Sequence, residues 1–163
     1  MYWCEAQVSH IRPTPWSYSA CPDCARKAVR EGSADGGCWF CDKCNKQFPA
    51  ARCRYVLTVQ LMDATGSLWA FAFDETAEPL LGKTADAMRA LSESADLAEQ
   101  ARFHHAFADA CFRSYRFKMQ ATQEEFHGVA RVSSKILACQ PMEFASSASS
   151  MLQKFQHLLA EAP

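Results

Sequence analysis

The first fifty residues of this chain are organised by four cysteines in two C-x-x-C pairs, Cys21 with Cys24 and Cys41 with Cys44. Sixteen residues separate the two pairs, a spacing typical of two turns that together hold one tetrahedral metal ion. Zn²⁺ prefers soft thiolate ligands, and four of them leave no coordination position open. The spacing therefore predicts a closed, structural zinc site.

Two alternatives use these cysteines differently. Cys38 stands three residues before Cys41, so these two are an alternative second turn, although only thirteen residues then separate it from Cys24. Disulfides are the other alternative, as in small secreted domains. Nine cysteines are an odd number and no apolar signal segment begins the chain, so we expect a reducing compartment. The cysteines expected to be small core residues are Cys4, Cys53, Cys111 and Cys139.

Size and charge set further limits. A chain of 163 residues with 49% apolar content suits one main core. No segment approaches the about 20 apolar residues that cross a bilayer, so we expect a soluble protein without membrane contact. The net charge is −1, yet residues 1–60 carry +3, residues 61–110 carry −6 and residues 111–163 carry +2. This separation permits a polyanion to bind on one side only.

Strand patterns with a period of two occur at Tyr2–Ile11, Arg54–Met62 and Ser67–Phe73. In the last of these, the alternation places Trp69, Phe71 and Phe73 on one face and aliphatic side chains on the other. Because the aliphatic face is enough to join a core, the aromatic face is a candidate platform for stacking unpaired bases. The alternative is a central strand that is buried on both faces.

The middle of the chain alternates between helix and strand signals. We expect helices over residues 74–81, 84–91 and 95–110, the first two marked by acidic or capping residues. Further strands are expected over residues 112–120 and 129–139. Their connection, residues 122–128, is a candidate binding loop because it holds Phe126, and an exposed phenylalanine suggests a contact surface. The alternative is an aromatic packed against the end of the sheet.

Residues 144–163 have the pattern of an amphipathic helix. Its apolar stripe includes Met151, Leu152, Phe155, Leu158 and Leu159. Such a helix packs either on its own domain or against helices of partner chains. We favour partner chains, because a sheet already covered by acidic helices leaves little room for another one.

These segments together resemble the C-terminal, zinc-containing OB-fold domain of the large subunit of eukaryotic replication protein A. The resemblance covers nearly the whole chain and rests on Tyr18–Lys27, Cys41–Cys44, Phe48-Pro49, Arg54–Asp63, Thr65–Trp69, Phe73–Ala77, Leu80–Gly82 and Phe112–Tyr115. It implies a mainly β (α+β) fold, with a five-stranded OB barrel over residues 1–143. A Cys4 zinc ribbon, residues 18–50 or so, is implied between the first two strands, and residues 144–163 are implied to be an oligomerisation helix.

The resemblance also implies a function: sequence-tolerant binding of single-stranded DNA in replication, repair and recombination, in the nucleus. The implied ligands of one structural Zn²⁺ are Cys21, Cys24, Cys41 and Cys44. The implied DNA contacts are Trp69, Phe73, Phe126 and Arg131, with Arg26, Lys27, Arg52 and Arg54 as basic residues near the groove. The terminal helix is implied to join one helix each from the middle and small subunits of a heterotrimer.

Alternatives to this function stay open at the level of sequence. One is a trimerisation scaffold that binds DNA only weakly, and another is a telomere-associated paralogue of the same family. An enzyme is not expected, because the chain has no P-loop, nucleophile elbow or HExxH motif. The sequence starts directly at the first strand of the expected barrel, so we also expect it to be one segment of a longer protein with other OB domains.

Overall fold

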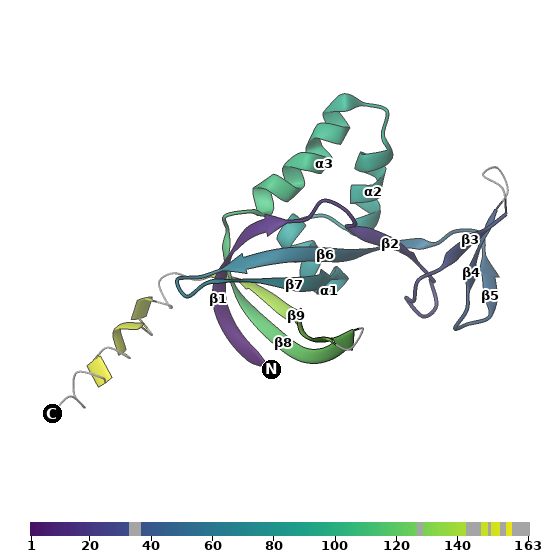
Figure 1. Cartoon of the computed structure of the whole chain (residues 1–163). Coiled ribbons are helices and arrows are strands. Elements are labelled where there is room, and N and C mark those ends of the chain that lie inside the picture. Colours follow the sequence, from purple (N-terminus) through teal and green to yellow (C-terminus); the bar gives the residue numbers. More distant parts are fainter. Residues whose placement is uncertain (33–36, 127–128, 143–147, 150, 154–155, 158–163) are drawn as a thin grey trace.

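Five long strands form a closed barrel in the computed structural model, which describes residues 1–32, 37–126, 129–142, 148–149, 151–153 and 156–157 (Figure 1). They are β1 (Tyr2–Ile11), β6 (Arg52–Met62), β7 (Ser67–Phe73), β8 (Ser114–Phe126) and β9 (Val129–Pro141). Around the barrel the order is β1-β6-β7-β9-β8, and β8 pairs with β1 to close it. Only the β7–β9 pairing among these is parallel. The fold is therefore the expected OB barrel.

Alternation along the strands separates the core from the outer surface. On β6 every second side chain is buried, from Cys53 through Tyr55 to Leu61, and the residues between them are half-buried. On β7 the buried positions are Ala70 and Ala72. These inward side chains meet others from β1, β8 and β9, so the barrel interior is one continuous apolar core.

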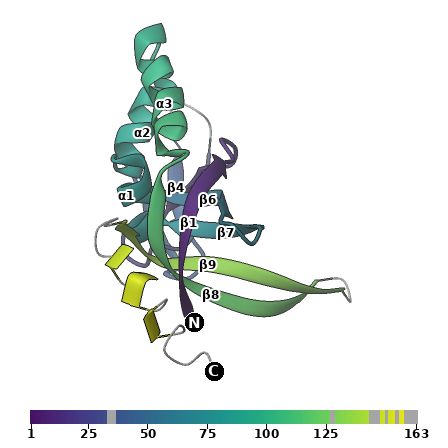
Figure 2. The same cartoon turned by 90° about the vertical axis from the view of Figure 1, so that its left-hand side faces the viewer.

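Three helices connect β7 to β8: α1 (Asp74–Leu81), α2 (Ala85–Glu93) and α3 (Leu97–Ala110). α1 packs against β6, β7 and β9, and α2 and α3 extend from the barrel on the side away from the β8–β9 hairpin (Figures 1 and 2). Thr84 caps α2 as expected, because its hydroxyl accepts a hydrogen bond from the Ala87 N–H at 3.3 Å. Gly82 ends α1 with a φ of 66°, a left-handed conformation that glycine adopts without strain. The three predicted helices are thus confirmed, with boundaries shifted by a few residues.

A small sheet of its own projects from one end of the barrel (Figure 1). Its strands are β3 (Val29–Glu31), β4 (Cys38–Cys41) and β5 (Lys46–Phe48), with β4 in the centre. β2 (Ser17–Ala20) precedes this ribbon and pairs with the start of β6. The ribbon is therefore inserted between the first and second strands of the barrel, where it was expected.

The β8–β9 hairpin is longer than its sequence predicts. The sequence predicts a loop over Thr122–Phe126, but this segment is strand and pairs with Val129–Ser133. The remaining part of the expected binding loop, residues 127–128, lies outside the described residues. Polar residues such as Glu124 and Glu125 have weak strand propensity, and only cross-strand pairing with β9 extends this arm.

The described part of the C-terminal segment is helical, over residues 148–149, 151–153 and 156–157. Met151 and Leu152, two members of the predicted apolar stripe, are exposed there. The other three members, Phe155, Leu158 and Leu159, lie outside the described residues, as does the expected domain boundary at 143–144.

Candidate metal centre and binding face

Four cysteine thiols converge at the junction of the ribbon and β2. The Sγ atoms of Cys21, Cys24, Cys41 and Cys44 all lie within 4.8 Å of one another. Cys21 and Cys44 are 3.9 Å apart, and Cys24 and Cys41 are 3.5 Å apart. A tetrahedral ion with Zn–S bonds of about 2.3 Å requires sulfur atoms about 3.8 Å apart. The four thiols therefore have the spacing of a site that holds one metal ion.

The two halves of this site are built in the same way. The Ala25 N–H donates to the Cys21 carbonyl at 2.9 Å, and the Asn45 N–H donates to the Cys41 carbonyl at 2.8 Å. Ala25 and Asn45 are both left-handed, with φ of 59° and 51°. Each C-x-x-C turn is thus closed by a residue with positive φ, which directs both of its thiols to the same point.

Cys38 does not join this cluster of described residues. It begins β4, where it pairs with Glu31, and an extended strand places residues three apart on opposite faces. Cys41 points to the four-thiol cluster, so Cys38 cannot. The second turn is therefore formed by Cys41 and Cys44, and none of the nine cysteines is in a disulfide.

The thiols affect one another's protonation. The Arg26 backbone N–H lowers the pKa of the Cys24 thiol to about 7, and the hydrogen bond with Cys24 raises the pKa of the Cys44 thiol to about 12. One thiolate forms readily, but the next one is opposed by the negative charge beside it. Four thiolates at these distances need a cation to compensate them, which a divalent metal ion supplies.

The outer face of β7 carries a row of aromatic side chains, as the sequence pattern predicts. Trp69 is 39% exposed and Phe71 is 40% exposed, while Phe73 is half-buried. Their partners on β6 are Gln60, Thr58 and Val56, which face the same side. The strand is thus buried on its alanine face only, and the alternative of burial on both faces is wrong.

Cations flank this aromatic row. The Arg12 guanidinium carbon lies 4.4 Å from the centroid of the Trp69 ring. The Lys135 ammonium lies 4.8 Å from the centroid of the Phe73 ring, and Lys135 is directly opposite Phe71 in the β7–β9 pairing. Sequence reasoning missed Arg12 and Lys135, because only the pairing of distant strands brings them to β7. Phe71 had a local signal in the period-two pattern, but the family resemblance did not include it.

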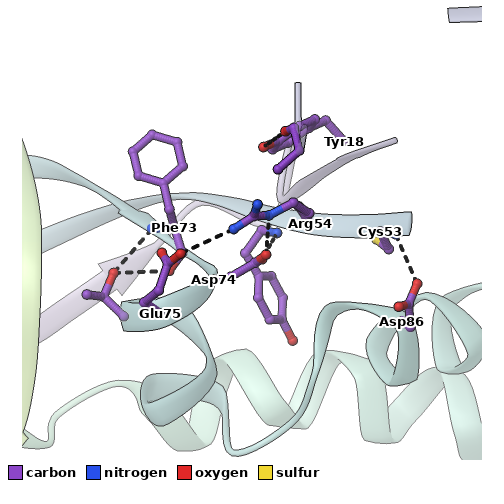
Figure 3. Close-up of polar contacts among 10 residues, drawn as sticks. Tyr18, Cys53, Arg54, Phe73, Asp74, Glu75 and Asp86 are labelled. Atoms are coloured by element: carbon purple, nitrogen blue, oxygen red, sulfur yellow. Dashed lines mark hydrogen bonds and ion pairs between the residues drawn. The ribbon is translucent and has the colours of Figure 1, made fainter. Parts of the chain in front are cut away.

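Arg54 is held by acidic residues of α1 (Figure 3). Its Nε donates to an Asp74 carboxylate oxygen and its Nη2 donates to Glu75 at 3.3 Å. The other Asp74 oxygen accepts from the Tyr55 backbone N–H at 2.6 Å. The charge of Arg54 is therefore compensated within the chain, and its side chain fixes the start of α1 against β6.

Three other predicted basic residues are exposed near the ribbon: Arg26, Lys27 and Arg52. Ala20, at the end of β2, is paired with two residues, Lys27 in the ribbon and Arg52 on β6. Paired residues point to the same face of a sheet, so the Lys27 and Arg52 side chains lie on the same face, on either side of Ala20. Arg52 also shares the outer face of β6 with Thr58 and Gln60, by unbroken alternation. A basic edge thus continues the aromatic row toward the ribbon.

Two further predicted contacts lie on the β8–β9 arm. Arg131 is exposed on β9, opposite Glu124, and four residues from Lys135 on the same face. Phe126 ends β8, and its side chain lies outside what the structure describes. The arm therefore places Arg131 about 13 Å beyond the aromatic row, given a rise of about 3.3 Å per residue.

The described helices include none that is long and apolar enough to span a membrane.

Barrel and cluster together define this chain as an OB-fold domain with an inserted four-cysteine ribbon. The chain belongs to the family described as "Replication factor-A C terminal domain", whose model matches residues 1–151. It is 33% identical over 147 residues to replication factor A protein 1 of Schizosaccharomyces pombe, a match covering 89% of this chain and 23% of that protein. It is 32% identical over 143 residues to the replication protein A 70 kDa DNA-binding subunit of Gallus gallus, covering 86% of this chain and 22% of that subunit.

A solved structure has the same fold. In a replication protein A heterotrimer bound to single-stranded DNA, one chain superimposes with a TM-score of 0.82 and 28% identity. That match covers 94% of this chain and 34% of the other. This chain thus spans about a quarter of the length of the curated relatives, and matches part of a DNA-binding subunit.

Proposed function

We propose that this chain binds single-stranded DNA along the outer face of β6 and β7, as part of a replication protein A complex in replication, repair and recombination. One observation carries the proposal most directly: the row of Trp69, Phe71 and Phe73 is solvent-facing and flanked by Arg12 and Lys135. Exposed aromatics interleaved with cations are the chemistry that unpaired bases and phosphates need.

Base stacking explains both selectivity and tolerance. Duplex DNA offers no free base faces, so Trp69 and Phe73 select single strands, with Phe71 between them. Every base has a π-face, so the sequence of the strand matters little. The proposed phosphate contacts, from the ribbon edge to the β8–β9 arm, are Arg26, Lys27, Arg52, Arg12, Lys135 and Arg131. Phe126 is proposed as a further contact at the end of that arm.

Arg54 has a different place in this proposal. Asp74 and Glu75 already neutralise it, so a phosphate gains little from approaching it. We assign Arg54 to positioning: it holds α1 against β6 next to Phe73, the last residue of the aromatic row.

The metal in the four-cysteine cluster is proposed to be one structural Zn²⁺. Four sulfur ligands at tetrahedral spacing suit Zn²⁺ and leave no position for a substrate. Its binding energy is folding energy for the ribbon, which has little apolar core of its own. The same closed coordination argues against catalysis, so we propose a binding protein and not an enzyme.

Residues 144–163 are proposed to be an assembly helix, separate from the barrel of residues 1–143. Met151 and Leu152 are exposed on its described part, and such side chains pack in a helix-to-helix interface. The proposed partners are the middle and small subunits of the heterotrimer, and the proposed location is the nucleus. A scaffold that assembles the trimer with weak DNA binding is the competing function.

Fluorescence anisotropy of labelled oligo-dT, titrated with the zinc-loaded chain, separates these functions. We expect single-strand binding without duplex binding, weakening with salt at a slope of about −0.7 per neutralised phosphate. The Trp69→Ala, Phe73→Ala double variant is expected to bind at least about thirtyfold more weakly, at about 1–3 kcal/mol per stacked base. Leu97→Ala is the control, because Leu97 is 80% exposed at the start of α3. Unchanged binding by the double variant would favour the scaffold.

A further inference from the structure

We infer a second contact site for single-stranded nucleic acid at Trp3 on β1, reached when the strand continues from β7 across β9 and β8. The inference rests on the proposed function and lengthens its binding path. Two independent features carry it: the local chemistry around Trp3, and a series of strand pairs that joins Trp3 to the aromatic row.

Trp3 repeats the arrangement found at Trp69. Its side chain is 44% exposed, against 39% for Trp69. The Arg116 guanidinium carbon lies 5.2 Å from the centroid of the Trp3 ring, as that of Arg12 lies 4.4 Å from the Trp69 ring. Each indole thus has an exposed surface for a base and a guanidinium beside it for a phosphate.

A second cation stands next to Trp3. Lys118 is directly opposite Trp3 in the antiparallel β1–β8 pairing, so both side chains face the outside of the barrel. Phe117 and Met119, on either side of Lys118, are buried in the core. The alternation on β8 therefore fixes Lys118 and the exposed Arg116 on the outer surface with Trp3.

Strand pairing connects this site to the aromatic row. Phe71 on β7 is opposite Lys135 on β9, and Lys135 is opposite Gln120 on β8. Lys118 is two residues before Gln120 on the same face of β8, and leads to Trp3. Figure 2 shows β8 and β9 side by side, next to the N-terminal half of β1. The path contains two lysines, a glutamine and an indole, and crosses no carboxylate.

The length of this path sets how much DNA it needs. Three spacings between neighbouring strands, about 4.8 Å each, and one step of two residues along β8 give on the order of 15 Å. One strand of a duplex rises about 3.4 Å per nucleotide, and a single strand can be more extended, so that distance corresponds to about four nucleotides at most. Oligonucleotides that only cover the β6–β7 face therefore end before Trp3, and longer ones reach it.

A protein partner is the other class of occupant for an exposed tryptophan. The surroundings favour nucleic acid, because protein interfaces are depleted in lysine at their centres, and Lys118 is directly opposite Trp3 while the Arg116 guanidinium lies near its ring. Glu5, opposite Arg116, is the acidic neighbour on this surface. It leaves the local charge positive, with two cations against one carboxylate.

The test compares Trp3→Ala with the unchanged chain on oligo-dT of about six and about twelve nucleotides, within the range known for one OB fold. For the longer strand we expect Kd to rise about tenfold, equivalent to about 1.4 kcal/mol. For the shorter strand we expect a change of less than about twofold. Trp69→Ala, in contrast, should weaken binding of both lengths.

Further variants keep the test decisive. Trp3→Phe retains an aromatic ring and should bind nearly as the unchanged chain does. Arg116→Gln should lower the salt slope by about 0.7 for the longer strand alone. Leu97→Ala is the control, and the midpoint of thermal unfolding is measured for every variant to verify that the barrel is folded.

Three outcomes would overturn the inference. In the first, the unchanged chain binds the longer oligonucleotide more tightly than the shorter one, and Trp3→Ala has the same Kd as the unchanged chain for both. The DNA path then does not include Trp3, although the proposed function stands. If the unchanged chain binds neither length, the proposed function fails as well. If Trp3→Ala weakens assembly with the partner subunits but leaves both DNA affinities unchanged, Trp3 is a protein contact.

Discussion

Asp74 offers a sharp test of how the barrel holds its aromatic row. One of its carboxylate oxygens accepts from the buried Tyr55 N–H at 2.6 Å and the other accepts from Arg54. Asp74→Ala removes a hydrogen bond between charged groups, worth about 1.5–3 kcal/mol, and leaves a buried N–H unpaired, at about 1–3 kcal/mol. The Arg54 and Asp74 side chains are 26% and 20% exposed, so water compensates part of this loss. We expect the free energy of unfolding to fall by about 3 kcal/mol.

Urea unfolding of the zinc-loaded chain measures this loss, and thermal unfolding should show a midpoint lower by about 6–12 °C. Glu75→Gln is the matched control: Glu75 also contacts Arg54, at 3.3 Å, but is 75% exposed, so we expect less than about 1 kcal/mol. Asp74→Asn should lie between the two, because its amide oxygen still accepts from Tyr55. If Asp74→Ala costs no more than Glu75→Gln, the assignment of this network to stability is wrong.

Four other predictions address the metal, the aromatic row, the basic edge and acid stability. Cys44→Ser should lower zinc content and DNA affinity together, measured by metal analysis and anisotropy; full zinc content would contradict its role as ligand. Phe71→Ala should raise Kd at least about fivefold without changing the unfolding midpoint, because Phe71 is exposed. Arg52→Gln should reduce the salt slope by about 0.7, whereas Arg54→Gln should leave the slope unchanged and lower stability. Hydrogen bonds from the Thr65 hydroxyl and N–H lower the pKa of Asp63 from 3.8. The ionised Asp63 therefore stabilises the folded state above pH 3.8, and this contribution is lost as the pH falls through its lowered pKa. Asp63→Asn should remove this part of the acid dependence of the free energy of unfolding, measured by urea titrations at several pH values.

The parts of the fold and of the candidate site that depend on residues close together in the sequence could be predicted. The two C-x-x-C turns need only a few residues each, and their sixteen-residue spacing favours Cys41 with Cys44 as the second turn, although only the structure shows that Cys38 is not part of the cluster. The alternation around Trp69 likewise requires only one amphipathic strand. Strong local patterns of this kind identify elements well, although element ends, such as that of β8, depend on pairing.

The parts of the candidate site that depend on contacts between residues far apart in the sequence could not be predicted. Lys135 reaches Phe71 only through the parallel β7–β9 pairing, and more than sixty residues separate the two in sequence. Arg54 has the same local context as Arg52, two residues earlier on the same face of β6, yet α1 places Asp74 beside only one of them. Whether one of these arginines is available to bind phosphate thus depends on where α1 begins, and the residues next to the arginine in the sequence do not determine that.

The pairing of β2 with β6 has a consequence for modular design. Ala20 and Arg52 lie directly opposite each other, so the ribbon between them starts and finishes at adjacent points of one antiparallel ladder. A tight two-residue turn connects such positions in hairpins. Replacing residues 21–51 by such a turn would give a metal-free barrel that keeps all five of its strands. Conversely, the excised segment contains all four clustered cysteines, so we expect that a β-hairpin in another protein could accept it as an insertion.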